Sequence, residues 1–147
     1  MRMLIVDDEE SIVFALRSTF KGYEIKSFND SFSAIENLKS NQYYDILIID
    51  LKLKGMSGID ILIEAKKNLT SYKSLLITAY PTEYLLQGSI DKDLISHVLY
   101  KPFSLKEITL KVNNLYDELL EEQMGIQGEE FLKNKGDRVT ENMLVFS

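Results

Sequence analysis

Two short apolar runs in this sequence stop abruptly at carboxylates. Residues 3–6 lead directly into Asp7 and Asp8, and residues 46–49 lead directly into Asp50. Apolar runs of about four residues are too short for a helix and are typical of strands that a parallel sheet buries on both faces. Because ligands bind beyond the carboxyl ends of the strands in such sheets, the three acids are candidates for a binding site.

Strand-like and helix-like patterns alternate along the chain. Hydrophobic patterning predicts strands over residues 3–6, 23–28, 46–49, 74–77 and 95–100. It predicts helices over residues 11–20, 58–69, 81–89 and 104 to about 123, and another that begins at a cap formed by Asn29 or Asp30. This alternation predicts an α/β fold, a doubly wound five-stranded parallel sheet in the order 2-1-3-4-5 with helices on both faces.

Composition excludes several classes of protein. The 147 residues suffice for one domain, and the absence of cysteine excludes disulfides, thiolate metal sites and cysteine nucleophiles. A single histidine, His97, excludes an imidazole-rich zinc site. The net charge of −6 does not favour direct binding to nucleic acid, and no apolar stretch approaches the ~20 residues that span a membrane. We therefore expect a cytoplasmic protein that contacts neither nucleic acid nor membrane.

The acidic cluster predicts a bound cation. In the expected sheet Asp7, Asp8 and Asp50 lie at the switch point between strands 1 and 3. At about 5 Å and an effective dielectric near 20, each ionised pair costs on the order of 3 kcal/mol. Oxygen ligands without cysteine or histidine indicate Mg²⁺ or a similar hard ion. The alternative is that the three acids are ordinary loop or helix-cap residues.

Two further predicted strands end in polar groups that handle phosphate. The fourth strand is followed by Thr78 and Ala79, and the fifth by Lys101. A metal and Lys101 would neutralise phosphoryl oxygens, Thr78 would hydrogen-bond one of them, and Asp50 would attack phosphorus in line. The residues alone therefore predict metal-dependent phosphoryl chemistry.

Taken together, these motifs resemble the receiver domain of bacterial two-component response regulators. The resemblance covers residues 2 to about 120 and implies a flavodoxin-like receiver fold over residues 1–123, followed by a linker or tail over residues 124–147. It lies in five motifs, in this order and one per successive structural element: Asp7-Asp8, Asp50, Gly55-Met56-Ser57-Gly58, Thr78-Ala79 and Lys101-Pro102-Phe103.

The resemblance implies a role for each acid. Asp50 would be the phosphoacceptor, taking the phosphoryl group from a histidine of a sensor kinase or phosphotransfer protein. Asp8 and Asp50 would bind Mg²⁺ directly, together with the backbone carbonyl of Lys52, and Asp7 would act through a metal-bound water. The protein would be a signalling switch that assists only its own phosphoryl transfer and dephosphorylation, not a turnover enzyme.

The same resemblance implies how the switch works. Lys101 would contact the acceptor carboxylate and then the phosphoryl oxygens, and a cis-compatible bond to Pro102 would fix the turn that aims it. Thr78, which precedes Ala79, would move toward the phosphoryl group. The change would reach partners through the face formed by the fourth helix, the fifth strand and the fifth helix.

Some positions depart from the family pattern. The switch aromatic of the family lies three residues before the lysine, where this chain has Val98, and Tyr100 is expected to point away from Lys101 across the strand. Read-out would then use the loop after the fourth strand, or Tyr80. Large side chains at Lys52 and Tyr80 would obstruct an in-line water, which predicts a comparatively long-lived aspartyl phosphate.

Other residues around the site are expected to be structural. Glu9 and Glu10 are predicted to be first-turn helix residues favoured by the helix dipole rather than ligands. Lys54 stands where a proline is common in the family, so we expect a less rigid loop after Asp50. An aromatic stripe is predicted to lie in the core: Phe14, Phe20, Phe28 and Phe32.

The last helix carries an apolar stripe that is longer than the sheet requires. Ile108, Val112 and Leu115 are expected to pack on the sheet, whereas Leu119, Leu120 and Met124 need another partner. A second copy of the chain would serve, which predicts a homodimer through this helix, or the tail would fold back, with a short helix near residues 129–134. The layout resembles the receiver-plus-linker part of regulators of sigma-54 transcription, and a stand-alone receiver is equally compatible.

Two rival functions stay open at this point. One is a Mg²⁺-dependent phosphohydrolase with an aspartyl-phosphate intermediate, a class that places a second acid two residues after its nucleophile; here that residue is Lys52. The other is a pseudo-receiver, an interaction module that is never phosphorylated, for which Val98 leaves some room.

Overall fold

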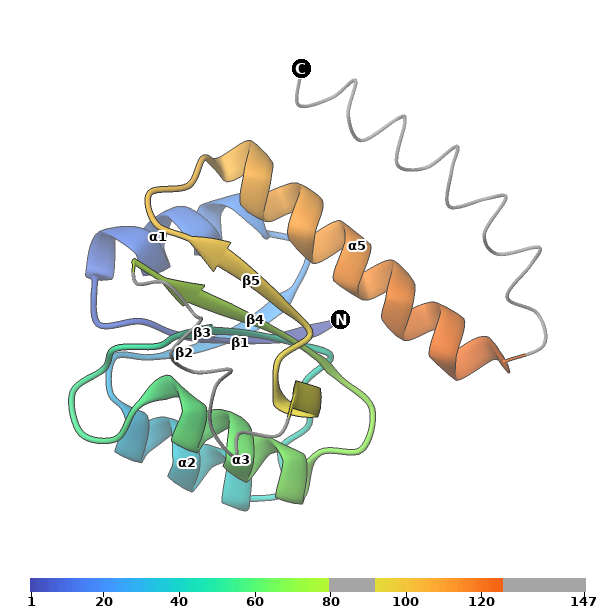
Figure 1. Ribbon diagram of the computed structural model, residues 1–147, viewed down its shortest axis with the longest axis horizontal. Helices are drawn as coiled ribbons and strands as arrows, with labels where there is room; N and C mark the ends of the chain where they lie inside the picture. Colours follow the sequence, from blue (N-terminus) through green and yellow to red (C-terminus); the bar gives the residue numbers. More distant parts are fainter. Residues whose placement is uncertain (80–91, 126–147) are drawn as a thin grey trace.

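The structure, a computed structural model, describes residues 1–79 and 92–125 (Figure 1). All of its strands join one parallel sheet in the order β2-β1-β3-β4-β5, as predicted. The strands are β1 (Arg2–Val6), β2 (Glu24–Phe28), β3 (Ile46–Asp50), β4 (Lys73–Thr78) and β5 (His97–Tyr100). The helices predicted over residues 81–89 and 129–134 lie outside the described residues.

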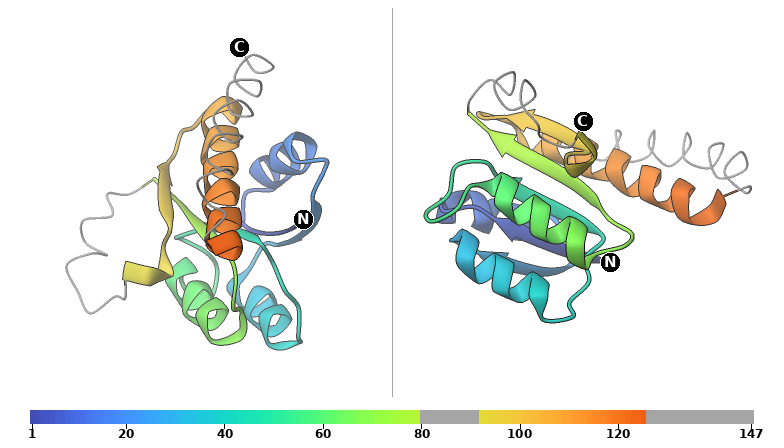
Figure 2. Two further views of the ribbon diagram at one scale, coloured as in Figure 1. Left: turned by 90° about the vertical axis from the view of Figure 1, so that its right-hand side faces the viewer. Right: turned by 60° about the horizontal axis from the view of Figure 1, so that its bottom comes forward.

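Helices cover both faces of the sheet, which confirms the doubly wound architecture. Two of them, α1 (Glu10–Thr19) and α5 (Leu105–Met124), pack on one face, and α2 (Ser31–Lys39) and α3 (Gly58–Asn68) pack on the other (Figure 2). A short 3₁₀ turn, η1 (Lys92–Leu94), precedes β5. Within the described ranges, no helix is long and apolar enough to cross a membrane.

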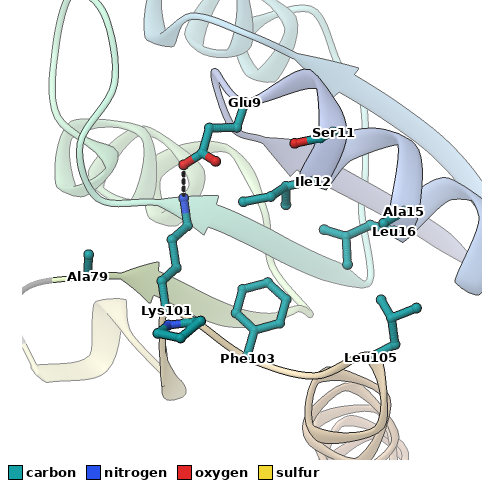
Figure 3. A pocket seen from close by; sticks show the side chains of 10 residues that line it. Glu9, Ser11, Ile12, Ala15, Leu16, Ala79, Lys101, Phe103 and Leu105 are labelled. Carbon is teal, nitrogen blue, oxygen red and sulfur yellow. Dashed lines mark hydrogen bonds and ion pairs between the residues drawn. The ribbon is translucent and has the colours of Figure 1, made fainter.

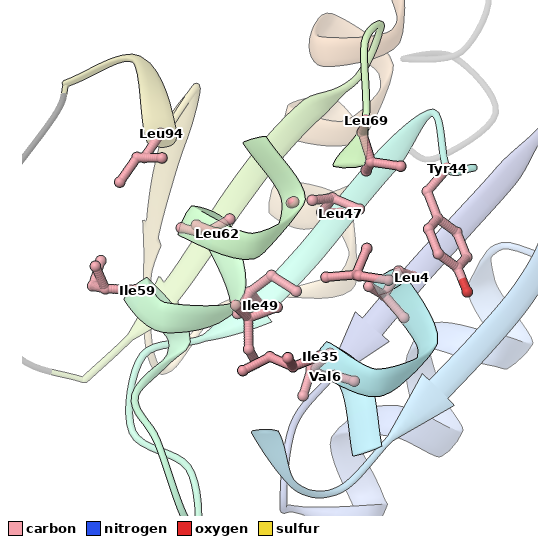
Figure 4. Packing of buried hydrophobic residues seen from close by; sticks show 14 of the residues in the cluster. Leu4, Val6, Ile35, Tyr44, Leu47, Ile49, Ile59, Leu62, Leu69 and Leu94 are labelled. Atoms are coloured by element: carbon pink, nitrogen blue, oxygen red, sulfur yellow. The ribbon is translucent and has the colours of Figure 1, made fainter. Parts of the chain in front are cut away.

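The apolar runs of β1 and β3 supply side chains to two cores. Because successive residues of a strand point to opposite faces, Leu4 and Leu47 pack with α2 and α3 (Figure 4), whereas Met3 and Ile48 pack with α1 and α5. All five residues of β3 are buried, including Asp50. Burial on both faces explains why these runs are continuously apolar and do not alternate.

The aromatic stripe is only partly in the core, so that prediction is wrong for two residues. Phe20 is 5% exposed, but Phe14 is 75% exposed and Phe32 is 55% exposed. Leu16 and Phe20, four residues apart, lie on the inward side of α1. Phe14 is two positions from Leu16, which places it on the opposite side of a helix with 3.6 residues per turn. Phe14 therefore faces outward.

Side-chain caps fix the starts of α2 and α5 close to the ends of the strands. Of the two candidates for the second helix, Asp30 is the cap, and its Oδ1 accepts a hydrogen bond from the backbone N–H of Ser33 at 2.8 Å. Ser104 and Glu107 form a reciprocal capping box at the start of α5. These caps set the points at which the chain turns back after β2 and β5.

The second half of α5 is tied to the chain segment that enters β4. Lys73 forms an ion pair with Glu122, and the Gln123 side chain donates a hydrogen bond to the Ser71 hydroxyl at 2.9 Å. Leu119 is 1% exposed within the single chain, so the prediction that it needs another partner is wrong, whereas Met124 is 40% exposed. Dimerisation through this helix stays a prediction.

Close approach of α3 to β3 depends on Gly58. A Cβ atom at this position would lie 2.2 Å from the backbone carbonyl oxygen of Asp50 and 3.0 Å from a side-chain carbon of Ile49. The amide of Gly58 also donates a hydrogen bond to the carbonyl of Leu51 at 2.8 Å. The absence of a side chain here lets the helix rest directly against the strand end that carries Asp50.

We therefore expect Gly58→Ala to lower the free energy of unfolding by about 1–3 kcal/mol, because the added methyl group must displace either α3 or the end of β3. Urea denaturation followed by circular dichroism measures this. The matched control is Gly22→Ala, where an added Cβ meets no atom within 4 Å. Equal effects at the two glycines would contradict the packing role given to Gly58.

Candidate phosphoryl-acceptor site

The carboxyl ends of β1 and β3 bring three acids together. Each of Asp7, Asp8 and Asp50 offers a carboxylate oxygen, and these oxygens lie within 4.8 Å of one another. Asp7 and Asp50 are buried, whereas Asp8 is exposed. Adjacent parallel strands end at the same edge of the sheet, and for this reason acids more than forty positions apart in the chain meet here.

Lys101 places one positive charge among these acids. Its Nζ lies 3.2 Å from Asp50, 3.3 Å from Asp7 and 3.1 Å from Glu9. Its backbone N–H donates a hydrogen bond to the carbonyl of Thr78 at 2.8 Å, which fixes the turn after β5 against the end of β4. The peptide bond between Lys101 and Pro102 is cis.

Burial and mutual charge shift the pKa values of the site. Burial, reinforced by the charge of Asp50, raises the pKa of Asp7 to about 6, although the N–H of Glu9 and the ammonium of Lys101 oppose the shift. Burial also raises the pKa of Asp50, against the attraction of Lys101. Burial acts to lower the pKa of Lys101, but Glu9, Asp7 and Asp50 outweigh it and raise that pKa. Burial thus disfavours the charged form of both carboxylates, and Lys101 offsets this effect only in part.

The donor set fits a hard divalent cation. Oδ2 of Asp7 is buried and, among the described residues, accepts no hydrogen bond, although it lies 3.3 Å from Lys101 Nζ. The three acids offer only oxygen atoms, the ligands that Mg²⁺ prefers. Lys52 follows Asp50 by two positions, and its backbone N–H lies 3.4 Å from the Asp50 carboxylate, so the loop that carries it begins at the cluster.

The residues predicted at the ends of β4 and β5 also lie at this edge. Thr78 is 1% exposed and pairs in register with Tyr100. Ala79 and Lys101 line a cavity of about 540 Å³. Phe103 and residues of α1 form other parts of its wall (Figure 3). The predicted tuning residue Tyr80 lies outside the described residues.

On β5, Val98 takes the position of the family's switch aromatic, and the structure shows where this residue and Tyr100 lie. Val98 packs against the core under α2 and α3, whereas Leu99 belongs to the core under α1 and α5. Tyr100 follows the same alternation and is 49% exposed. The aromatic residue of β5, Tyr100, is thus the register partner of Thr78 and lies two residues after the position of the family's switch aromatic.

Ser31 is a site-supporting residue that sequence reasoning missed. Its hydroxyl is fully buried, donates a hydrogen bond to the carbonyl of Lys54 at 3.1 Å and accepts one from the N–H of Met56 at 2.6 Å. Gly55 between them has φ of 91°, and the ring of Phe32 lies over it. The start of α2 therefore anchors the loop after Asp50, although that loop lacks a proline. A serine after a capping aspartate gives no sequence signal of such a contact.

Glu9, predicted to lie in the first helical turn, makes a contact with Lys101 that the sequence does not predict. It occupies the N-cap position of α1, yet its side chain makes no capping hydrogen bond and reaches Lys101 (Figure 3). Its backbone N–H donates a hydrogen bond to Asp7 at 2.8 Å. The only sequence signal was a third consecutive acid after the strand.

The fold and the site define an α/β module that gathers acids and a lysine at the switch point of a parallel sheet, with a buried threonine at the end of the next strand. The sequence model of the response regulator receiver domain matches residues 3–113. The chain therefore belongs to the response regulator receiver domain family, the receiver of two-component systems.

Individual relatives agree with this family. The chain is 30% identical over 115 residues to response regulator SaeR of Staphylococcus aureus, a match that covers 77% of this chain and 49% of that protein. It thus spans about half the length of the curated relatives it matches. A structure of response regulator TrrA from Thermotoga maritima in complex with Mg²⁺ and BeF is 29% identical, with a TM-score of 0.64 over 78% of this chain and 97% of that one.

A further solved structure bears on the fold alone. A CheY-like receiver domain protein from Methanospirillum hungatei is 24% identical and aligns with a TM-score of 0.74, covering 82% of this chain and 97% of that chain. The flavodoxin-like receiver architecture predicted from the sequence is therefore confirmed.

The raised pKa of Asp7 generates a prediction for the metal-free protein. Because the folded state binds this proton more tightly than the unfolded state, stability falls as the pH rises from about 4 to 6. Asp7→Asn should therefore raise the free energy of unfolding at pH 7 in EDTA by roughly 1–3 kcal/mol. Urea denaturation at pH 7 and at about pH 4 measures this.

The gain should shrink at the lower pH, where the wild-type carboxyl is already protonated. Added Mg²⁺ should stabilise the wild type more than Asp7→Asn. A variant that is less stable than the wild type at pH 7 in EDTA would contradict the electrostatic account.

Proposed function

We propose that Asp50 is the phosphoacceptor of this receiver domain and takes a phosphoryl group from a histidine of a sensor kinase or phosphotransfer protein. The observation that carries the proposal is the position of its carboxylate, at the end of β3, 3.2 Å from Lys101 and in one cluster with Asp7 and Asp8. A carboxylate beside a cation and a metal site is poised to attack phosphorus while neighbouring charges offset the incoming phosphoryl oxygens.

Mg²⁺ is the proposed cofactor. Asp8, Asp50 and the backbone carbonyl of Lys52 would hold the ion, and Asp7 would act through a water. The ion would supply positive charge to the phosphoryl oxygens. Support comes from the all-oxygen donor set, and from the relative TrrA, whose structure contains Mg²⁺ and BeF.

The chain's own residues would then convert phosphorylation into a change of shape. Lys101 would pass from the Asp50 carboxylate to the phosphoryl oxygens, and the Thr78 hydroxyl would bind another of these oxygens. These contacts, which need the phosphoryl group, would favour the active conformation and shift the population toward it. Because the Lys101 N–H bonds to the carbonyl of Thr78, the ends of β4 and β5 would move together.

Further parts of the function extend beyond the described site. Since the curated relatives are about twice as long as the matched region, we propose that the chain acts within or beside an output module, and a role in transcription and a homodimer through α5 are both compatible with it. A cytoplasmic location, with no direct binding to nucleic acid or membrane by this chain, stays a prediction.

Neither rival function gains support from the site. A phosphohydrolase would need a second acid two residues after Asp50, where the chain has Lys52. A pseudo-receiver would not need Lys101 and three carboxylates converging at one strand edge. The family to which the chain belongs acts as a phosphorylation-controlled signalling switch.

Phosphorylation of Asp50 can be tested directly. Incubation with acetyl phosphate and Mg²⁺ should add the mass of one phosphoryl group, measured by intact-protein mass spectrometry, and Asp50→Asn should abolish the gain. The matched control Asp45→Asn, at an acid outside the cluster, should keep it. Many turnovers of a small phosphomonoester would instead support the phosphohydrolase.

The lifetime of the phosphoryl group is a separate prediction. Lys52, and Tyr80 outside the described residues, are proposed to hinder an in-line water. We expect the double variant Lys52→Asn with Tyr80→Glu to lose phosphate several-fold faster than the wild type, measured as decay of the phosphorylated mass after donor removal. An unchanged decay rate would show that neither side chain tunes dephosphorylation.

A further inference from the structure

Three carboxylates surround the ammonium group of Lys101, and only two of them belong to the metal cluster. Lys101 donates hydrogen bonds to Glu9 at 3.1 Å and to Asp50 at 3.2 Å, and lies 3.3 Å from Asp7. An ammonium has three N–H groups and no acceptor, so each added anion must share these donors with the others. Glu9 is the one partner that the proposed function does not use.

The three partners differ in how readily they can leave Lys101. The side chain of Asp7 is 2% exposed and that of Asp50 is 8% exposed, whereas that of Glu9 is 55% exposed. A buried carboxylate that loses its cation is left desolvated, but an exposed one is rehydrated at little cost. Glu9 can therefore release Lys101 into the site without leaving a buried charge behind.

The contact is specific to Glu9 and not a general property of the acidic helix start. Its backbone is held by the hydrogen bond from its N–H to Asp7 and by the first turn of α1, whose amides at Ile12 and Val13 bond to its carbonyl. From this fixed N-cap position the side chain crosses to a residue 92 positions away in the chain (Figure 3). Glu10, the next residue, is exposed and begins the helix.

We propose that Glu9 is a positioning residue that competes with the phosphoryl group for Lys101 and thereby favours the unphosphorylated form. This inference rests on the proposed function, because it concerns the same lysine and the same acceptor. In the resting protein Glu9 holds part of the lysine's charge. Once Asp50 carries a phosphoryl group, Glu9 draws Lys101 away from that group. The negative charge of Glu9 also repels the phosphoryl group.

The charge of Glu9 acts in opposite directions on two ligands. A phosphoryl group or its mimic adds negative charge next to Asp50. The Asp50 carboxylate shares Lys101 with Glu9. Removal of the Glu9 charge therefore strengthens binding of the phosphoryl mimic. Mg²⁺ alone is attracted by the same charge, and it is also repelled less when Lys101 is partly neutralised by Glu9. Removal of that charge therefore weakens Mg²⁺ binding.

The test uses Glu9→Gln, which keeps the size of the side chain and removes its charge. Titration calorimetry of the full chain would measure the affinity for Mg²⁺ alone, and for beryllofluoride, a phosphoryl mimic, at saturating Mg²⁺. We expect beryllofluoride affinity to rise about threefold and Mg²⁺ affinity to fall about twofold, changes of the size that solvent-screened charge pairs produce. Glu9→Ala is the second variant, with the same directions expected.

The matched control is Glu10→Gln, which changes the net charge equally but removes no contact with Lys101. It should leave beryllofluoride affinity within the error of the wild type. A purely structural role of Glu9 would weaken both ligands or neither, and opposite shifts exclude it. Urea denaturation of each variant checks that the fold is intact.

Suppose that the wild type binds beryllofluoride and Asp50→Asn does not. The inference is then overturned if Glu9→Gln binds beryllofluoride no more tightly than Glu10→Gln. A different result overturns the proposed function as well: beryllofluoride binding that is absent in the wild type, or that survives in Asp50→Asn. The two failures are therefore distinguishable.

Discussion

The ion pairs of Lys101 with buried carboxylates are the interaction on which the rest of the site depends. Asp7 and Asp50 lie at the ends of two neighbouring central strands and are buried. Without a cation, desolvation would disfavour both charges and the two carboxylates would repel each other. Lys101 comes from the turn after β5 and joins that edge strand to the centre of the sheet. A single lysine thus lets a parallel sheet keep an acidic cluster at its switch point.

Lys101 offsets the charges of these buried carboxylates only in part. Burial raises the pKa of Asp7 to about 6 even with Lys101 present, and the proposed Mg²⁺ would add further positive charge at the cluster. Under the proposed function this cation would also offset the charge of the phosphoryl oxygens, and Lys101 would then move from its carboxylate partners to the phosphoryl group. Gly58 lets α3 rest against the end of β3, and Ser31 anchors the loop after Asp50 through Lys54 and Met56.

The fold and the central site residues were predictable because they follow from local patterns. Four-residue apolar runs specify strands buried on both faces, and parallel strands bring the residues after them to one edge. Asp7, Asp50 and Lys101 could therefore be placed together from the sequence alone. The outward position of Phe14 could not be predicted from its apolar character, because the angular position of a residue decides which face of an amphipathic helix it occupies. The contacts of Glu9 and Ser31 span 92 and 23 positions and leave no local pattern.

A crystal structure of the chain with Mg²⁺ and beryllofluoride would test the central claim most directly. The account predicts beryllium bonded to a carboxylate oxygen of Asp50, with Mg²⁺ shared by Asp8 and Asp50 and the Lys101 ammonium in contact with fluoride. Beryllofluoride bonded to a different residue, or Lys101 turned away from a beryllofluoride on Asp50, would contradict it.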